Sequence, residues 1–263
     1  MAYMETHFFS DVLRMGVPVS VILPEYIKKG AGEKPCPTLY LLHGLSDDHT
    51  MWMRRTSIER YADEHRIAVV MPEVARSWYT DTADGAPYLT FVGEELPSVC
   101  RGFFRGMSER REDTWIAGLS MGGYGALKTA LTYPERFGGC ASLSGALDIL
   151  RRCEAKKSDE RSAREWRGIF GFDLRGADDL RDGRDDLFGL ARRRAAAGEP
   201  FPRMFLWCGT EDSLLDENRR FHALLTEGGI AHRYAESEGN HSWQWWDLHI
   251  REAIRFLSGG GNE

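Results

Sequence analysis

The sequence has no long apolar run: none approaches the ~18 residues that a helix needs to cross a bilayer. It has no excess of basic residues, because 34 Lys and Arg stand against 40 Asp and Glu, for a formal net charge of −6. Nucleic-acid binders usually carry a basic patch, so this balance argues against that class. The first residues show no basic start followed by an apolar stretch, and we therefore expect no secretion signal. We predict that neither a membrane nor a nucleic acid is a partner.

Cysteine is scarce, with five residues in 263 and no C-x-x-C pair. They are Cys36, Cys100, Cys140, Cys153 and Cys208. An odd number at such wide spacing argues against a zinc site or a disulfide framework. We expect reduced, mostly buried thiols, no metal, no cofactor and a cytoplasmic location. The sequence leaves open whether the chain forms a homo-oligomer.

Short apolar runs of strand length are present instead. They cover residues 37–44, 67–73, 114–120, 138–145 and 203–210. Apolar runs without polar alternation are typical of strands buried on both faces, as in parallel sheets. Helical patterns lie between these runs. This order predicts an α/β fold with a mainly parallel sheet and helices on both faces. Before these runs, residues 7–13 and 17–24 read as strands joined by a turn at Met15 and Gly16.

A charged segment interrupts the alternation. Of residues 151–200, 24 of 50 are charged, and the segment has one compact apolar patch, "EWRGIFGF". We predict a single domain, residues 1–263, with a cap-like helical insertion at about 148–200 between two core strands. The insertion could cover a pocket or form a solvated surface, and composition alone favours the second.

The stretch "TWIAGLSMGGYGAL" contains the pattern G-x-S-x-G from Gly118 to Gly122. An apolar strand leads into Ser120 and a helical pattern follows it, which is the setting of a nucleophile elbow. Small neighbours suit a serine that is held in an unfavourable backbone conformation. The alternative is a glycine-rich turn between strand and helix without any chemistry.

A serine nucleophile needs a base and an orienting acid, which follow it in the order Ser, Asp or Glu, His in α/β-hydrolases. Asp212 falls just past the strand at 203–210, with Glu211 and Asp216 as rivals. His241 lies in a loop before the last helical pattern, and we predict it as the base. Other histidines fall on predicted helices or a strand: His222, His232 and His249.

Acyl transfer also requires N–H donors for the negative charge that develops on the carbonyl oxygen. We predict the backbone N–H groups of Met121 and Leu45, the second from the loop after the strand that ends at His43-Gly44. For His43 we favour a structural role in that loop. Three aromatic residues follow strand ends and are candidates for substrate binding, with ordinary packing as the alternative. These are Trp52, Trp78 and Tyr79.

Seven blocks in order carry a family resemblance: "HGLSDDHTMWMRRT", "VVMPEVARSWYTD", "EELPSV", "IAGLSMGGYGALKTAL", "SLSGALD", "CGTEDSLL" and "GNHSWQWWD". Together they resemble the esterase D family of α/β-hydrolases, closest to its tributyrin esterase branch. The resemblance spans about residues 6 to 257. It implies the α/β-hydrolase fold, the triad of Ser120, Asp212 and His241, and oxyanion donors at Leu45 and Met121.

The resemblance also implies serine carboxylesterase activity on short acyl chains, with a small-molecule ester as the partner. Alternatives are an acetyl-xylan or feruloyl esterase acting on sugar or plant-derived esters, and an S-formylglutathione hydrolase. The chain reads "SGALDILRRC" where S-formylglutathione hydrolases carry a Pro-Trp-Gly stretch, which weakens that assignment. A binding protein on an inactive hydrolase fold is a further hypothesis, and the intact Ser-Asp-His set argues against it.

Overall fold

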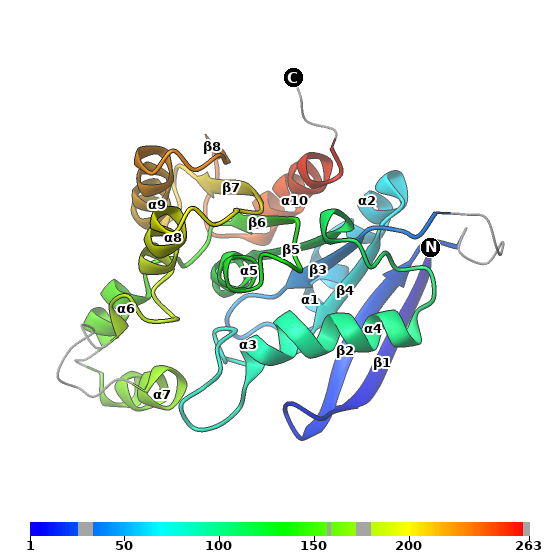
Figure 1. Ribbon diagram of the computed structural model, residues 1–263, viewed down its shortest axis with the longest axis horizontal. Coiled ribbons are helices and arrows are strands. Elements are labelled where there is room, and N and C mark those ends of the chain that lie inside the picture. Colours follow the sequence, from blue (N-terminus) through cyan, green and yellow to red (C-terminus); the bar gives the residue numbers. More distant parts are fainter. Residues whose placement is uncertain (26–33, 157–158, 172–179, 260–263) are drawn as a thin grey trace.

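The computed structural model describes residues 1–25, 34–156, 159–171 and 180–259. Its centre is an eight-stranded sheet in the order β1-β2-β4-β3-β5-β6-β7-β8 (Figure 1). The strands are β1 Ala2–Ser10, β2 Met15–Leu23, β3 Thr38–Leu42, β4 Ala68–Pro72, β5 Thr114–Leu119, β6 Gly139–Leu143, β7 Arg203–Gly209 and β8 Arg233–Ser237. The six strands β3 to β8 run parallel, and β1 and β2 add an antiparallel edge. The predicted mainly parallel sheet is confirmed.

Burial explains why apolar and polar residues do not alternate along the central strands. Every residue of β3, β4, β5 and β6 is buried, because helices cover both faces of the sheet there. The edge strand β1 instead alternates between half-buried and exposed residues along most of its length. The position of a strand in the sheet therefore sets its pattern: central strands are continuous apolar runs, whereas the edge strand alternates between half-buried and exposed residues.

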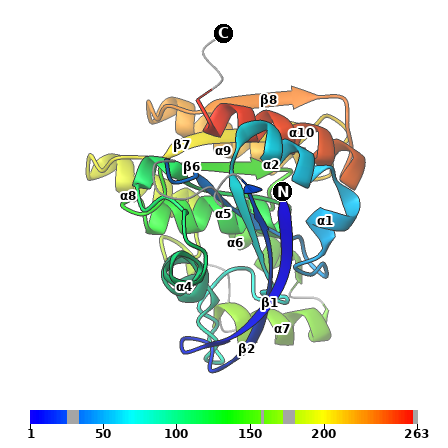
Figure 2. The ribbon, with the colours of Figure 1, turned by 90° about the vertical axis from the view of Figure 1, so that its right-hand side faces the viewer.

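Helices cover both faces of the sheet. They are α1 Met51–Arg55, α2 Ile58–His65, α3 Tyr88–Thr90, the π-helical segment η2 Phe91–Glu95, α4 Leu96–Phe103, the 3₁₀ turn η3 Arg111–Asp113, α5 Met121–Thr132, α6 Ile149–Lys156, α7 Glu160–Phe170, α8 Leu187–Ala196, α9 Leu215–Glu227 and α10 Trp243–Leu257. One apolar cluster joins the sheet to α2 and α10, and a larger one joins it to α4, α5 and α9. In both views α2 and α10 lie together, away from α4 and α5 (Figures 1 and 2). None of the helices in the described ranges is long and apolar enough to span a bilayer.

The charged insertion between β6 and β7 contains α6, α7 and α8. The carboxylates of Asp159 and Asp186 cap the first turns of α7 and α8, and α7 ends at Gly171 in the left-handed region. The apolar side of α7, including Trp166 and Phe170, is buried in the larger cluster, whereas its charged residues face outward. The insertion therefore packs onto the α5 side of the molecule while keeping a solvated outer face. Its residues 157–158 and 172–179 lie outside the described ranges.

The predicted turn at Met15 and Gly16 is wrong, because β2 already begins at Met15. The chain reverses over residues 11–14 instead. Glu95 accepts hydrogen bonds there from the N–H of Asp11 (2.7 Å) and of Val12 (3.2 Å). A carboxylate distant in the sequence thus stabilises this turn by accepting its free N–H groups.

Candidate active site

The three predicted triad residues follow three parallel strands that point the same way. Ser120 comes directly after β5, Asp212 follows β7, and His241 follows β8. The carboxyl ends of parallel strands meet at one edge of a sheet, which is where such folds bind ligands. The fold therefore delivers all three side chains to the same edge.

Ser120 has φ 52° and ψ −116°, a conformation that non-glycine residues rarely adopt. The sharp turn brings its neighbours against the backbone. A Cβ at Gly118 would lie 2.4 Å from the carbonyl of Gly122, and one at Gly122 would lie 2.4 Å from the carbonyl oxygen of Leu42. The small residues of the motif are therefore required by close backbone contacts around a strained serine.

The side chains of Ser120, His241 and Asp212 form one chain of hydrogen bonds. His241 Nε2 lies 3.0 Å from Ser120 Oγ, and His241 Nδ1 lies 2.9 Å from Asp212 Oδ2 and 3.1 Å from Oδ1. An ionised carboxylate only accepts, so Nδ1 carries the proton and Nε2 is free to accept from the serine hydroxyl. The structure thus brings together the three residues that the sequence paired.

The Asp212 carboxylate is buried, whereas His241 is partly open to solvent. Burial acts to raise the pKa of Asp212, but hydrogen bonds from His241, from the Leu214 N–H and from Ser144 outweigh it, so the pKa is lowered. Asp212 is therefore a carboxylate at neutral pH and can orient an imidazole and stabilise its charged form.

The rival residues have other partners. Asp216 pairs with Arg151 and Arg220 at the surface, and Glu211 is an exposed residue. His249 stacks on Trp207, and His222 lies 2.7 Å from His232, nitrogen to nitrogen. All of these contacts are made away from the hydrogen-bond chain that contains Ser120.

The loop after β3 has a fixed peptide unit between Gly44 and Leu45. The Val74 N–H donates to Nε2 of buried His43 (3.2 Å), which leaves the proton on Nδ1, and Nδ1 donates to the Gly44 carbonyl (2.8 Å). The Asp47 N–H donates to the same carbonyl (3.2 Å). In a trans peptide the C=O and N–H point in opposite directions, so the Leu45 N–H faces away from these donors.

Met121 is the first residue of α5, and the helical hydrogen bonds begin with Tyr124 N–H donating to the Ser120 carbonyl. The Met121 N–H therefore lies ahead of the helical ladder, at the positive end of the helix. The predicted oxyanion donors are thus backbone groups on the loop after β3 and on the helix after Ser120.

The three aromatic candidates for substrate binding are buried core residues, as the packing alternative expects. Trp52 is 1% exposed and donates its indole N–H to the Leu42 carbonyl, while Tyr79 is fully buried and donates its hydroxyl to the His43 carbonyl. Trp78 packs against Trp166 of α7. These rings hold the loops at the sheet edge, so their burial is explained by packing and hydrogen bonding.

Arg76 is a residue at this edge that sequence reasoning missed. Its guanidinium donates to Ser46 Oγ (2.7 Å) in the loop after β3 and to Glu165 Oε2 (3.1 Å) on α7. A cavity of about 550 Å³ lies beside it, between residues 76–88 and α7. Glu165 lies 89 positions from Arg76, and nothing local in the sequence indicates their pairing.

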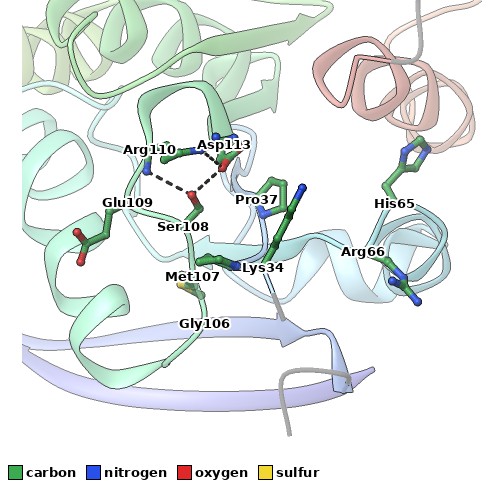
Figure 3. Close-up of a pocket in the computed structure, with 11 residues that line it drawn as sticks. Lys34, Pro37, His65, Arg66, Gly106, Met107, Ser108, Glu109, Arg110 and Asp113 are labelled. Atoms are coloured by element: carbon green, nitrogen blue, oxygen red, sulfur yellow. Dashed lines mark hydrogen bonds and ion pairs between the residues drawn. The ribbon is translucent and has the colours of Figure 1, made fainter. Parts of the chain in front are cut away.

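A larger cavity, of about 950 Å³, lies at the opposite edge of the sheet (Figure 3). Its lining includes Pro37 and Asp113, the residues that directly precede β3 and β5, and Ser108 and Arg110 bond to Asp113 there. Cavity volume alone would therefore have pointed to the edge of the sheet that lies opposite Ser120. Within the described ranges, no group of three or more His, Cys, Asp or Glu side chains is arranged to hold a metal.

Comparison with known proteins gives consistent matches over nearly the whole chain. The Esterase family model matches residues 10–257. An acetyl esterase of Caldicellulosiruptor saccharolyticus is 32% identical, covering 98% of both chains. Two solved structures from Staphylococcus aureus also cover 98% of both chains: the substrate-bound serine hydrolase FphF (33% identity, TM-score 0.88) and the S-formylglutathione hydrolase FrmB (32%, TM-score 0.85).

These matches cover the sheet, the insertion and the edge that carries Ser120, and the relatives are serine hydrolases of the α/β-hydrolase type. The resemblance to the esterase D family is confirmed, and the chain is a serine ester hydrolase whose substrates are small-molecule esters. By sequence and by fold, it belongs to the Esterase family, in the esterase D-like group.

Proposed function

We propose that the chain hydrolyses short-chain acyl esters through a covalent acyl-enzyme on Ser120. The observation that carries this proposal is the 3.0 Å contact between His241 Nε2 and Ser120 Oγ, with Nδ1 held by Asp212. A base within hydrogen-bond reach, itself oriented by an acid, is the arrangement that activates a serine. The acetyl esterase relative supports a short acyl group.

In the first step Ser120 Oγ attacks the ester carbonyl while His241 Nε2 takes the hydroxyl proton. The new oxyanion accepts hydrogen bonds from the N–H groups of Leu45 and Met121, and Asp212 stabilises the imidazolium. The tetrahedral intermediate then collapses, and His241 returns the proton to the departing alcohol. A water molecule repeats both steps on the acyl-enzyme, which releases the acid and restores Ser120.

We expect purified protein to turn over p-nitrophenyl acetate and propionate faster than the octanoate, because the relative that supports a short acyl group is an acetyl esterase. Replacing Ser120 with Ala should lower kcat by a factor on the order of 10⁴ to 10⁶. A fluorophosphonate probe should label the parent protein and leave the variant unlabelled. A folded Ser120→Ala variant that keeps most of its turnover would refute the assignment.

A second candidate reaction is thioester hydrolysis, because the FrmB structure, described as an S-formylglutathione hydrolase, is 32% identical over 98% of the chain. The same panel should therefore include S-formylglutathione, acetylated xylo-oligosaccharides and methyl ferulate. A kcat/KM at least a hundredfold higher on one of these than on p-nitrophenyl acetate would replace the simple ester as the preferred substrate.

We also propose that the protein works in the cytoplasm. All five cysteines are buried thiols outside any disulfide, which suits a reducing compartment. Fractionation of the native cells with an antibody to the chain would test this location.

A further inference from the structure

The first strand of the sheet is a long edge without the usual protection. β1 runs over nine residues, Ala2–Ser10, and among the described strands it pairs with β2 alone. Figure 2 views the molecule from this side and shows β1 in front, at the border of the sheet. Proteins usually protect such an edge with Lys, Pro, a bulge or a short strand. β1 contains no Lys or Pro, and its register with β2 is continuous, so the edge is a template for another strand.

The direction of the main-chain groups of β1 follows from Pro18 on β2. The Pro18 carbonyl accepts a hydrogen bond from the N–H of Glu73 (3.2 Å), so residue 18 turns its main-chain groups to the β4 side of β2. His7 lies opposite Pro18 in the register of β1 and β2, and it therefore turns its own N–H and C=O away from β2. Because these groups alternate in direction along a strand, the odd-numbered residues of β1 point them to the free edge. These residues are Tyr3, Glu5, His7 and Phe9.

Apolar rings flank this edge on both faces of β1. Phe9 is 66% exposed and Tyr3 is 41% exposed, and successive side chains of a strand point to opposite faces. On the other face, Phe8 meets Phe103 of α4 edge to face, with ring centroids 6.1 Å apart, and Phe103 is 63% exposed. Exposed apolar side chains that gather in one place are typical of a protein contact site.

β1 is complementary to itself in one antiparallel register. A two-fold axis at Thr6 places Glu5 of one copy opposite His7 of the other. The imidazole can donate a hydrogen bond to the carboxylate, and opposite-charge cross-strand pairs are favourable. The same axis places Tyr3 opposite Phe9, which is a favourable aromatic pair. An axis at Glu5 would oppose two carboxylates, and an axis at His7 would place Glu5 against Phe9.

The main-chain groups agree with the side chains on this register. The residues that it sets opposite each other are the ones whose N–H and C=O groups face the free edge, and each such pair can exchange two hydrogen bonds. On the opposite face of β1, the half-buried side chain of Met4 in one copy would lie against Phe8 of the other, beside exposed Phe103. Hydrogen bonds, charges and apolar rings are therefore all matched by one axis.

We propose that the chain forms a two-fold symmetric homodimer through β1, with the β1 strands of two copies antiparallel about Thr6 and their sheets joined into one. The occupant of the edge is a second copy of this chain, because the edge matches its own sequence in charge and in apolar surface. A two-fold pairing leaves neither β1 edge open to further strands. This inference does not depend on the proposed reaction, since its tests measure association.

The first test is sedimentation equilibrium of the parent chain, which should give the mass of a dimer at micromolar concentrations. His7→Pro removes an N–H that points to the free edge, and proline is tolerated in an edge strand at such a position. It should raise the dissociation constant of the dimer by about ten- to hundredfold, because each copy loses an intermolecular hydrogen bond. A dissociation constant unchanged in a folded His7→Pro variant would overturn the proposal.

A charge swap tests the register. His7→Glu places two carboxylates opposite each other at both symmetric positions, and it should weaken the dimer by about tenfold. Adding Glu5→His restores a pair of opposite charge, so the double variant should regain a dissociation constant within about threefold of the parent value. A double variant weaker than His7→Glu alone would contradict this register.

Cysteine cross-linking tests the axis directly. Two copies of Thr6 would face each other as a non-hydrogen-bonded pair, with Cα atoms about 4.5 Å apart, and a disulfide bridges about 4.4–6.8 Å. Met4→Cys is the matched control on the same face of β1, because residue 4 lies opposite residue 8 and the two new thiols are about 13 Å apart along the strands. The native cysteines are buried. After mild oxidation, non-reducing electrophoresis should show a covalent dimer for Thr6→Cys and a monomer for Met4→Cys.

A second pair of variants separates this edge from other apolar surface. Phe9→Ala should weaken the dimer by about tenfold. Leu248→Ala removes a side chain of α10 that is 51% exposed, and it should change the dissociation constant by less than about twofold. Turnover of p-nitrophenyl acetate at the parent rate shows that each variant is folded, because β1 carries none of the triad residues. A parent chain that sediments as a monomer throughout the micromolar range, or equal cross-linking of Thr6→Cys and Met4→Cys, would overturn the proposal.

Discussion

At the scale of the residue, one peptide unit sets the direction of the Leu45 N–H, the proposed oxyanion donor. His43 and the Asp47 N–H both bind the carbonyl of Gly44, and the Leu45 N–H belongs to the same rigid peptide plane. Rotation of that plane would change the direction of the Leu45 N–H. His43 therefore determines the direction of a group that it does not itself touch.

We expect His43→Ala to lower kcat by about ten- to hundredfold. This loss is smaller than the loss of about 10²- to 10³-fold in kcat that follows when an oxyanion donor is removed outright. The free energy of unfolding should also fall by about 1–3 kcal/mol, because the buried Val74 N–H loses its acceptor. Steady-state kinetics and urea unfolding measure the two effects.

His49→Ala is the control in the same loop, since the His49 imidazole binds Glu73 (Nδ1 to Oε2, 3.4 Å) and, among the described residues, makes no hydrogen bond to the Gly44 carbonyl. Its kcat should stay near the parent value. The role given to His43 would be wrong if His43→Ala were destabilised but turned over substrate at the parent rate.

The triad could be predicted from the sequence because each member leaves a local signal. Ser120 has its glycines, Asp212 follows an apolar strand, and His241 sits between a strand and a helix. Ser144 leaves no such signal. Its hydroxyl meets the indole of Trp246 from 102 positions away, a contact that only the folded chain shows. For the three aromatic candidates the sequence left substrate binding and packing open, because loop position does not reveal which way a ring points.

At the scale of the element, a buried ion pair joins the helix after the nucleophile to the insertion. Lys128 on α5 has no exposed surface, and its ammonium binds Asp185 and Thr80, while the Tyr124 hydroxyl donates to the Asp185 carbonyl (2.9 Å). Burial lowers the pKa of Lys128 and Asp185 acts against that shift.

We expect Lys128→Met to lower the free energy of unfolding by about 3–5 kcal/mol, because buried Asp185 then loses the ammonium and keeps only the more distant, largely exposed guanidinium of Arg184, at 3.7 Å. The double variant Lys128→Met with Asp185→Asn should recover more than half of that loss. Urea unfolding of both variants measures the difference. Arg151→Met is the control, since its ion pair with Asp216 is largely exposed and such pairs contribute about 0–1 kcal/mol.

If Lys128→Met and Arg151→Met lowered the free energy of unfolding by the same small amount, the Lys128–Asp185 ion pair would not be what holds the insertion to α5. A double variant no more stable than Lys128→Met would show that methionine itself disturbs the packing of α5.

The elements themselves were largely predictable, and the exception is informative. The parallel strands were placed within one or two residues of their ends because buried apolar runs mark them directly. The first hairpin was misplaced because its turn depends on Glu95, which bonds the N–H groups of Asp11 and Val12 from more than 80 positions away. Local turn chemistry at Met15 and Gly16 could not show that contact.

At the scale of the whole molecule, two apolar clusters share one sheet, and the insertion belongs to the larger of them. That cluster includes Tyr40 of β3, Tyr124 of α5, Trp166 of α7 and Leu187 of α8. Composition favoured a solvated surface for the insertion, and its charged residues do face outward, but composition could not show that a few apolar residues anchor it in the core. Opening the insertion would expose the core on which α5 packs.

We therefore expect the chain to unfold as one cooperative unit, although it has 263 residues and chains of this length often populate intermediates. Far-UV circular dichroism and tryptophan fluorescence should give the same urea midpoint. Hydrogen exchange should show peptides from α7 and α8 losing protection together with peptides from β5 and β6, because the insertion cannot detach without exposing Trp166 and its neighbours to water. Protection lost from α7 and α8 at a clearly lower urea concentration would instead make the insertion a separate unit, and the single-domain prediction would be wrong.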